Sequence, residues 1–177
     1  MVFTSKISWY ARTSRKNVKI DLIMPKGRYY GCFNSIMSIC GKKRNEITIL
    51  HLVKTYCLPR LLYACEVMPF SSVQTRELQV MWHNAFWRIF NCYWRESVKP
   101  LQYFCTSLPL TWLLDERKLL FYRKAMVHSN TVLRTLMSAV YSKYVSLCDK
   151  YNINKPYCSI RCIKQSIWNA FAKSVAL

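Results

Sequence analysis

Clusters of lysine and arginine are the residues of this sequence best suited to chemistry, and the chemistry they favour is the capture of phosphate groups. Ammonium and guanidinium groups donate charged hydrogen bonds to phosphate oxygens and displace the counterions around them. One cluster lies near the N-terminus, one follows a glycine near position 41, and one lies along a later amphipathic segment. The candidate phosphate contacts are Arg12, Arg15, Lys16, Lys19, Lys42, Lys43, Arg44, Arg117, Lys118, Arg123 and Lys124.

The overall charge favours nucleic acid as the partner of these clusters. The 177 residues include 27 Lys and Arg against 8 Asp and Glu, a formal net charge of +19. Such an excess repels itself in a compact chain, and the repulsion is relieved when phosphates neutralise it. A membrane-surface or ribosome-associated basic protein is the alternative that charge alone leaves open.

The carboxylates do not form the pattern of a catalytic site. Asp115 and Glu116 are the only adjacent pair, and their position before Arg117 and Lys118 in a helical pattern predicts an ordinary ion-paired or solvated face. The chain has no glycine-rich phosphate loop, G-x-S-x-G or H-E-x-x-H motif. We therefore expect neither enzyme activity nor a cofactor. The three histidines are expected at the surface or in structural roles: His51, His83 and His128.

Nine cysteines, an odd number, and the lack of an apolar signal core in residues 1–10 favour a reducing, intracellular location in the nucleus or cytoplasm. Cys158 and Cys162, with Cys148 and His128, are a weak candidate for zinc because no histidine follows the C-x-x-x-C. No run of about 20 apolar residues predicts a membrane span. The six cysteines before Cys148 fall in helical apolar patterns and are expected to pack as small hydrophobic residues: Cys32, Cys40, Cys57, Cys65, Cys92 and Cys105.

Hydrophobic residues recur at spacings of three and four, and only three glycines occur, which predicts an all-α fold: an irregular bundle of six to seven helices. Around the basic turn Thr13–Asn17, residues 7–10 and 18–20 predict a short N-terminal β-hairpin or an arm. Asn45 and either Ser71 or Ser72 are predicted N-caps, and Pro59 predicts a kink. The predicted helices cover about 25–40, 45–57, 72–90, 109–129, 131–151 and 156–171, with a short segment at 61–68 and an amphipathic stretch at 98–105.

Four segments, in this order and at this spacing, resemble the thumb region of non-LTR, LINE-type retrotransposon reverse transcriptases. The first is YYGCFNSIM at 29–37, and the second and most specific is HLVKTYCLPRLLYACE at 51–66. WRIF at 87–90 is similar to the family's aromatic-basic-aliphatic-Phe step. Leu-Pro at 108–109 followed by RKLLF at 117–121 is similar to its Leu-Pro and Arg-Lys-x-x-Phe pair. Within these segments we expect Phe33, Leu62 and Tyr63 to be core residues.

The resemblance implies a helical thumb that grips template and growing strand. The family's catalytic Tyr-x-Asp-Asp box lies in the palm, and no such box occurs here, so we expect a thumb fragment without polymerase activity. We expect an N-terminal arm or palm connection at 1–24, a thumb-like bundle at 25–130 and a helical extension at 131–177. The expected partner is nucleic acid, duplex or single strand, without sequence preference. The alternative is a remnant that packs on a palm domain in trans and has no independent function, as its six tryptophans suggest.

Overall fold

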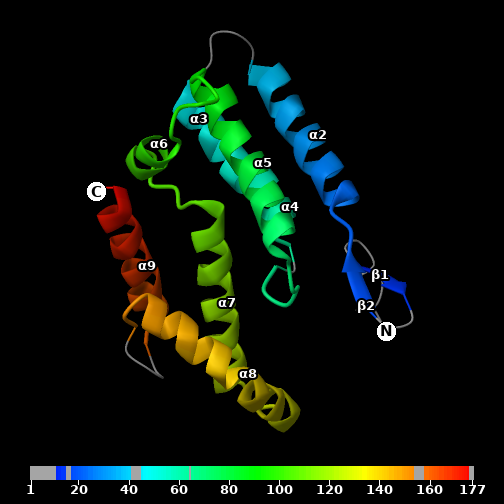
Figure 1. The fold of residues 1–177 in the computed structure, drawn as a ribbon. Coiled ribbons are helices and arrows are strands. Elements are labelled where there is room, and N and C mark those ends of the chain that lie inside the picture. The colour runs from blue at the N-terminus through cyan, green and yellow to red at the C-terminus, as the bar shows by residue number, and fades with distance from the viewer. Residues whose placement is uncertain (1–10, 15–16, 41–44, 64, 154–157, 176–177) are drawn as a thin grey trace. The chain divides into compact units, whose positions relative to one another are not determined.

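The computed structural model describes residues 11–14, 17–40, 45–63, 65–153 and 158–175, and it confirms the all-α class. The chain divides into two compact units, residues 1–98 and 99–177 (Figure 1). With the contiguous α3, η1 and α4 counted as one, seven helices occur in the described ranges, in agreement with the predicted six to seven.

A two-stranded antiparallel ribbon precedes the helices of the first unit. Strand β1 (Ala11–Ser14) pairs with β2 (Asn17–Ile20), with Arg12 opposite Lys19. The predicted hairpin is therefore present, and its turn is shorter than expected, because Thr13 and Ser14, which were assigned to the turn, pair with Val18 and Asn17. The predicted strand at 7–10 lies outside the described residues.

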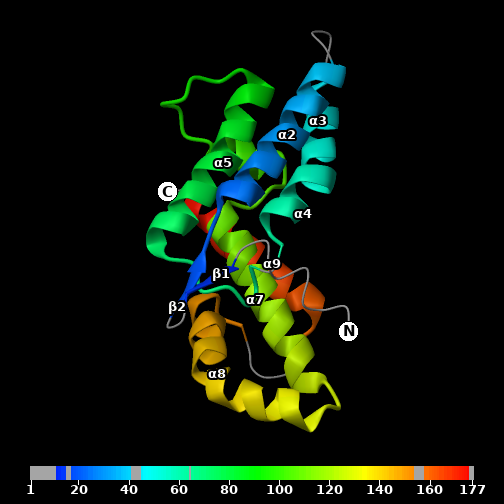
Figure 2. The same ribbon diagram turned by 90° about the vertical axis from the view of Figure 1, so that its right-hand side faces the viewer.

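Helices α2 (Ile23–Cys40) and α5 (Ser72–Phe90) lie side by side and run in the same direction (Figures 1 and 2). Three polar contacts progress along both helices: Lys26 with Glu77, Asn84 Nδ2 to Tyr30 Oη at 3.3 Å, and Arg88 Nη1 to Asn34 Oδ1 at 2.9 Å. Between these contacts the two helices bury Tyr29, Phe33, Trp82 and Phe86. The aromatic residues, spaced four apart on each helix, therefore form a shared core.

A kinked helix completes the first unit. It begins as α3 (Glu46–Leu52), widens into the π-helix η1 (Val53–Cys57) and ends as α4 (Leu58–Leu61). The predicted cap is confirmed, because Asn45 Oδ1 accepts from the amides of residues 47 and 48. At Pro59, where a kink or a brief break was predicted, the helical backbone continues, and the irregularity is the π segment just before the proline. In the short segment expected at 61–68, α4 ends at Leu61, and the later described residues form turns and irregular chain.

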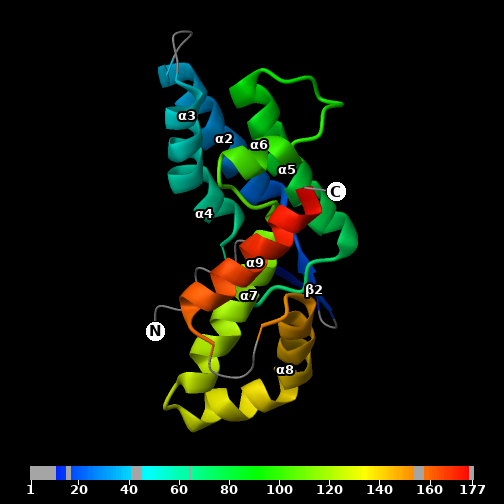
Figure 3. The same ribbon diagram turned by 90° about the vertical axis from the view of Figure 1, so that its left-hand side faces the viewer.

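The second unit contains α6 (Lys99–Phe104), α7 (Leu110–Val127), α8 (Thr131–Lys150) and α9 (Ile160–Val175). Helix α7 packs on both α8 and α9, and α9 also contacts α6 (Figure 3). Their common core consists of Leu108, Leu119, Tyr144, Cys148, Tyr151, Ile153, Ile163, Ile167 and Phe171. The units divide between residues 98 and 99, whereas the expected boundary at 130 falls inside this core, between two helices that pack on each other.

Two expectations about burial are wrong. Tyr63, expected in the core with Phe33 and Leu62, is 43% exposed, because α4 ends at Leu61 and the chain turns outward, whereas the other two are buried. In the predicted stretch 98–105, the spacing of Val98, Leu101, Phe104 and Cys105 predicts one apolar side. In α6, however, Phe104 is 80% exposed and Gln102 is fully buried. A helix of six residues has too few turns for spacing to define its buried side.

Candidate nucleic-acid interface

A turn follows α5 and carries two adjacent, exposed aromatic residues. Helix α5 ends at Asn91, whose φ of 52° is left-handed, and the amide of Cys92 donates to the carbonyl of Trp87 at 3.1 Å. The indole Nε1 of Trp87 donates to the carbonyl of Glu96 at 3.2 Å. Since the Glu96 amide donates to the carbonyl of Tyr93 at 2.9 Å, the segment is tied to the last turn of the helix. Figures 2 and 3 show it projecting from the end of α5.

Tyr93, Trp94 and Arg95, here called the aromatic turn, present two rings and a guanidinium to solvent. Tyr93 is 55% and Trp94 60% exposed, and their ring centroids lie 5.8 Å apart at 45°. The Cζ atom of Arg95 lies 4.8 Å from the Trp94 ring centroid. Exposed rings of this kind stack on unpaired bases of any sequence, and a neighbouring arginine adds cation–π and phosphate contacts.

The aromatic turn depends more on stacking than on charge. Glu96 follows Arg95 directly and offsets its positive charge locally. Burial, and secondarily the Glu96 carboxylate, raise the pKa of the Cys92 thiol, which keeps this cysteine protonated at neutral pH. The turn therefore supplies base contacts, and the positive charge needed for phosphate must come from other residues.

The predicted cations of α7 have different surroundings. Arg123 Nε donates to the carbonyl of Cys158 at 2.7 Å, which gives this half-buried side chain a structural role between α7 and the start of α9. Arg117 and Lys118 are also half-buried, and Lys124 is exposed. The structure thus leaves Lys124 as the most accessible of these four phosphate candidates.

The other predicted contacts lie near the N-terminus and at positions 42–44. Arg12 and Lys19 are register partners in the β-ribbon, so two candidates that are seven positions apart in sequence become direct neighbours. The remaining five candidates lie outside the described residues: Arg15, Lys16, Lys42, Lys43 and Arg44.

The adjacent carboxylates form ion pairs, as the sequence predicted. Asp115 Oδ2 lies 2.6 Å from Lys150 Nζ and accepts from the Tyr151 hydroxyl at 2.7 Å. Glu116 Oε1 lies 3.8 Å from Lys164 Nζ, and burial raises the pKa of this carboxyl group. In the described ranges, no three His, Cys, Asp or Glu side chains gather as metal ligands would.

The two C-terminal cysteines considered for zinc are joined to each other. Cys158 and Cys162 form a disulfide with Cα atoms 6.0 Å apart, one helical turn apart at the start of α9. This differs from the expectation of a reducing location without disulfides. The other seven cysteines remain thiols. Cys57 is fully buried, and burial together with Cys32 raises its pKa to about 12, so it packs as an inert core residue, as expected.

Comparison with protein-family models, curated proteins and solved structures found no match for this chain. Among the described helices, none is both long and apolar enough to cross a membrane.

Sequence reasoning missed the aromatic turn. Its signal was present, since Tyr93, Trp94 and Arg95 follow a helix stop and have no place in an apolar stripe. Aromatic residues were assigned to cores by type. Hydrogen bonds hold residues 92 and 96 to the end of α5, and the segment between them leaves both rings exposed to solvent.

Proposed function

We propose that this chain binds nucleic acid without sequence preference and does not polymerise it. The aromatic turn is the observation that supports this most directly, because it presents two exposed rings and a guanidinium on a segment that is hydrogen-bonded to the end of α5. Stacking on an aromatic ring contributes about 1–3 kcal/mol per base. Since only unpaired bases expose their faces, the turn favours single strands or the unpaired end of a duplex.

Phosphate contacts supply the rest of the affinity. The first unit carries 15 Lys and Arg against 5 acidic residues, and the second carries 12 against 3. Several of these acids are engaged within their unit, including Glu77, Asp115 and Glu116. Each unit therefore retains a large positive excess, and such an excess binds phosphates of any sequence.

The resemblance to a LINE-type reverse-transcriptase thumb supports the same proposal. Three of its segments form α2, the kinked helix and the end of α5, and the fourth forms α7 and the residues before it. A thumb grips nucleic acid while the palm performs the chemistry, and this sequence contains no Tyr-x-Asp-Asp box. We therefore assign the chain a gripping role without catalysis.

Binding of fluorescein-labelled oligonucleotides, measured by anisotropy at low salt, tests the proposal. We expect a single strand of about 20 nucleotides to bind, and the double variant Tyr93→Ala/Trp94→Ala to weaken binding by about tenfold or more through lost stacking. Tyr56→Ala is the matched control, since Tyr56 is also an exposed tyrosine of the first unit. The absence of binding by the wild-type chain would overturn the function. Equal effects of both variants would remove the aromatic turn from the interface.

Primer extension tests the catalytic half of the proposal. With a primed RNA template and magnesium or manganese, the purified chain should give no product above a blank, because no carboxylate cluster holds the two metals that activate the primer hydroxyl. Reproducible extension by this chain alone contradicts the non-enzyme assignment.

Exposed apolar side chains favour the second candidate, a remnant that packs on a palm domain in trans. On α2, Ile23 is 73% and Ile39 85% exposed, and Met24 is exposed beside the first. Gel filtration with a dye that reports apolar surface distinguishes the two functions. A monomer with little dye binding favours the self-contained module, and a dye-binding oligomer favours the remnant.

A further inference from the structure

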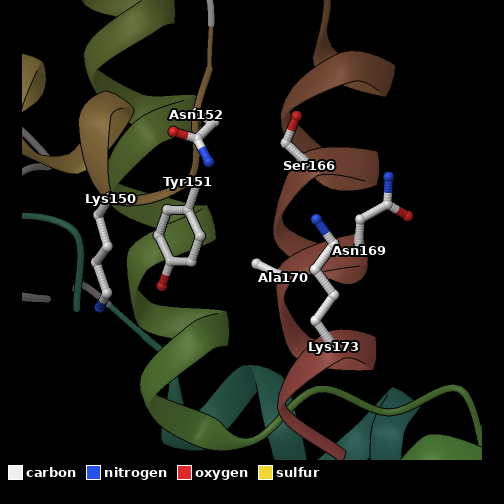
Figure 4. Close-up of a pocket in the computed structure, with 7 residues that line it drawn as sticks. All are labelled: Lys150, Tyr151, Asn152, Ser166, Asn169, Ala170 and Lys173. Carbon is white, nitrogen blue, oxygen red and sulfur yellow. The ribbon is translucent and has the colours of Figure 1, made fainter. Parts of the chain in front are cut away.

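A polar pocket of about 220 Å³ lies in the second unit, between α9 and the end of α8 (Figure 4). Lys150, Tyr151 and Asn152 line it on one side, and Ser166, Asn169 and Lys173 on the α9 side. Figure 4 shows the Lys173 side chain running back along α9 to the level of Asn169. No carboxylate is among the lining residues, which distinguishes the pocket from a cation site.

The backbone around Asn152 fixes one wall of the pocket. Asn152 has a φ of 52°, and its amide donates to the carbonyl of Asp149 at 3.2 Å. The next amide, of Ile153, donates to the carbonyl of Cys148 at 2.9 Å, and the Ile153 side chain is buried in the core of the unit. The chain therefore closes α8 with a left-handed residue, and asparagine is one of the few residue types that adopt this conformation readily.

The lining groups are mainly hydrogen-bond donors. Asn169 Oδ1 accepts from Gln165 Nε2 at 2.9 Å, which leaves the Asn169 Nδ2 hydrogens for another acceptor. The Ser166 hydroxyl and the side-chain NH2 group of Asn152 add further donors, and Lys173 adds a charged one. Lys173 forms no ion pair with the residues that the structure describes, so its charge is available to a ligand.

The nearby acid Asp115 does not oppose an anion strongly. Its carboxylate is paired with Lys150 and accepts the Tyr151 hydroxyl, so its charge is locally compensated. Burial, and then Asp115, raise the pKa of Tyr151, which keeps the phenol protonated as a donor. Asp149 is exposed one position before Lys150 and is the remaining acid near this wall.

We propose that this pocket binds the phosphate group of a phosphomonoester. The donors and the lysine match the oxygens of a small anion, and a volume of about 220 Å³ is below the roughly 300–1,000 Å³ of pockets that enclose a whole small-molecule ligand. A phosphate with part of its sugar fits this volume, and a whole nucleotide does not. Two sources present this chemistry: the 5′-terminal phosphate of a nucleic acid, which rests on the proposed function, and a free small phosphomonoester, which does not.

Calorimetric titration of the full chain with inorganic phosphate, against chloride at matched ionic strength, tests the pocket independently of nucleic acid. We expect saturable binding that Lys173→Gln weakens by about tenfold. Lys143→Gln is the control, because Lys143 is an exposed lysine of α8 that does not line the pocket. Both lysines are exposed, and circular dichroism confirms the fold of each variant. Failure to saturate, or equal weakening by both variants, overturns the proposal.

Oligonucleotides of one sequence with a 5′-phosphate or a 5′-hydroxyl then identify the source. A phosphate-dependent gain in affinity that disappears in Lys173→Gln assigns the pocket to nucleic-acid ends. Equal affinities, with inorganic phosphate still bound, assign it to a free phosphomonoester. Loss of all oligonucleotide binding with phosphate binding intact contradicts the proposed function and leaves the pocket assignment in place.

Discussion

His83 connects the chemistry of a single residue to the stability of the first unit. It lies half-buried on α5, and its ring meets Trp87 edge-on at 5.9 Å between centroids. Burial lowers the pKa of His83 below 6.5. His83 therefore takes up its proton at a lower pH in the folded chain than in the unfolded chain. Between these two pKa values, protonation favours the unfolded state.

The free energy of unfolding should accordingly fall as the pH drops from about 7.5 through the unfolded-state value of about 6.5 and on to the lower folded value. The contribution of His83 to the slope of unfolding free energy against pH corresponds to the uptake of less than one proton on unfolding. Urea unfolding at several pH values measures it, and His83→Gln should remove it while His51→Gln, at an exposed position, leaves it unchanged. If the two variants showed the same pH profile, His83 would not be the group responsible.

At the scale of elements, the kinked helix shows how a local irregularity serves packing. Ile49, Val53, Cys57 and Leu61 are buried at a strict spacing of four, which drifts by about 40° per step around a regular α-helix. The π segment between residues 53 and 57, where the Leu58 amide donates to the carbonyl of Val53, slows that drift. The apolar stripe therefore stays on the side that packs against α2.

Leu62 follows this helix directly and is 1% exposed, so Leu62→Asp should unfold the first unit. The carboxylate would be buried without a partner, and we expect a loss of at least about 3 kcal/mol. Circular dichroism and limited proteolysis measure the loss. Val67→Asp, at an exposed position a few residues later, is the control. Unchanged helix content and melting temperature in the Leu62 variant would contradict this placement of the core.

At the scale of the whole molecule, two units with separate cores share the positive charge. Binding of nucleic acid should weaken steeply between low and physiological salt, because each neutralised phosphate releases counterions. Neutralising Lys42, Lys43 and Arg44 together should make the slope of log affinity against log salt shallower by up to about three units, with the melting temperature unchanged. An unchanged slope would show that these three residues make no phosphate contacts.

Much of the helical framework could be predicted from sequence, because its signals are local. Asn45 and Ser71 cap α3 and α5 as expected, and Ser71 forms a reciprocal capping box with Gln74. The start of α7 after Pro109 was also correct. These capping signals involve residues no more than four positions apart, so they can be recognised from the sequence alone. The charge balance is likewise a property of composition and required no structure.

Tertiary packing alone decided which side chains are accessible. Phe104 is exposed and Gln102 buried although their types suggest the opposite, and Arg123 donates to the carbonyl of Cys158, 35 positions away. The aromatic turn depends on hydrogen bonds back to α5, and the polar pocket joins residues near 150 to α9. The exposure of a side chain depends on neighbours that are distant in sequence. The positions of those neighbours cannot be inferred from hydrophobic periodicity or residue type.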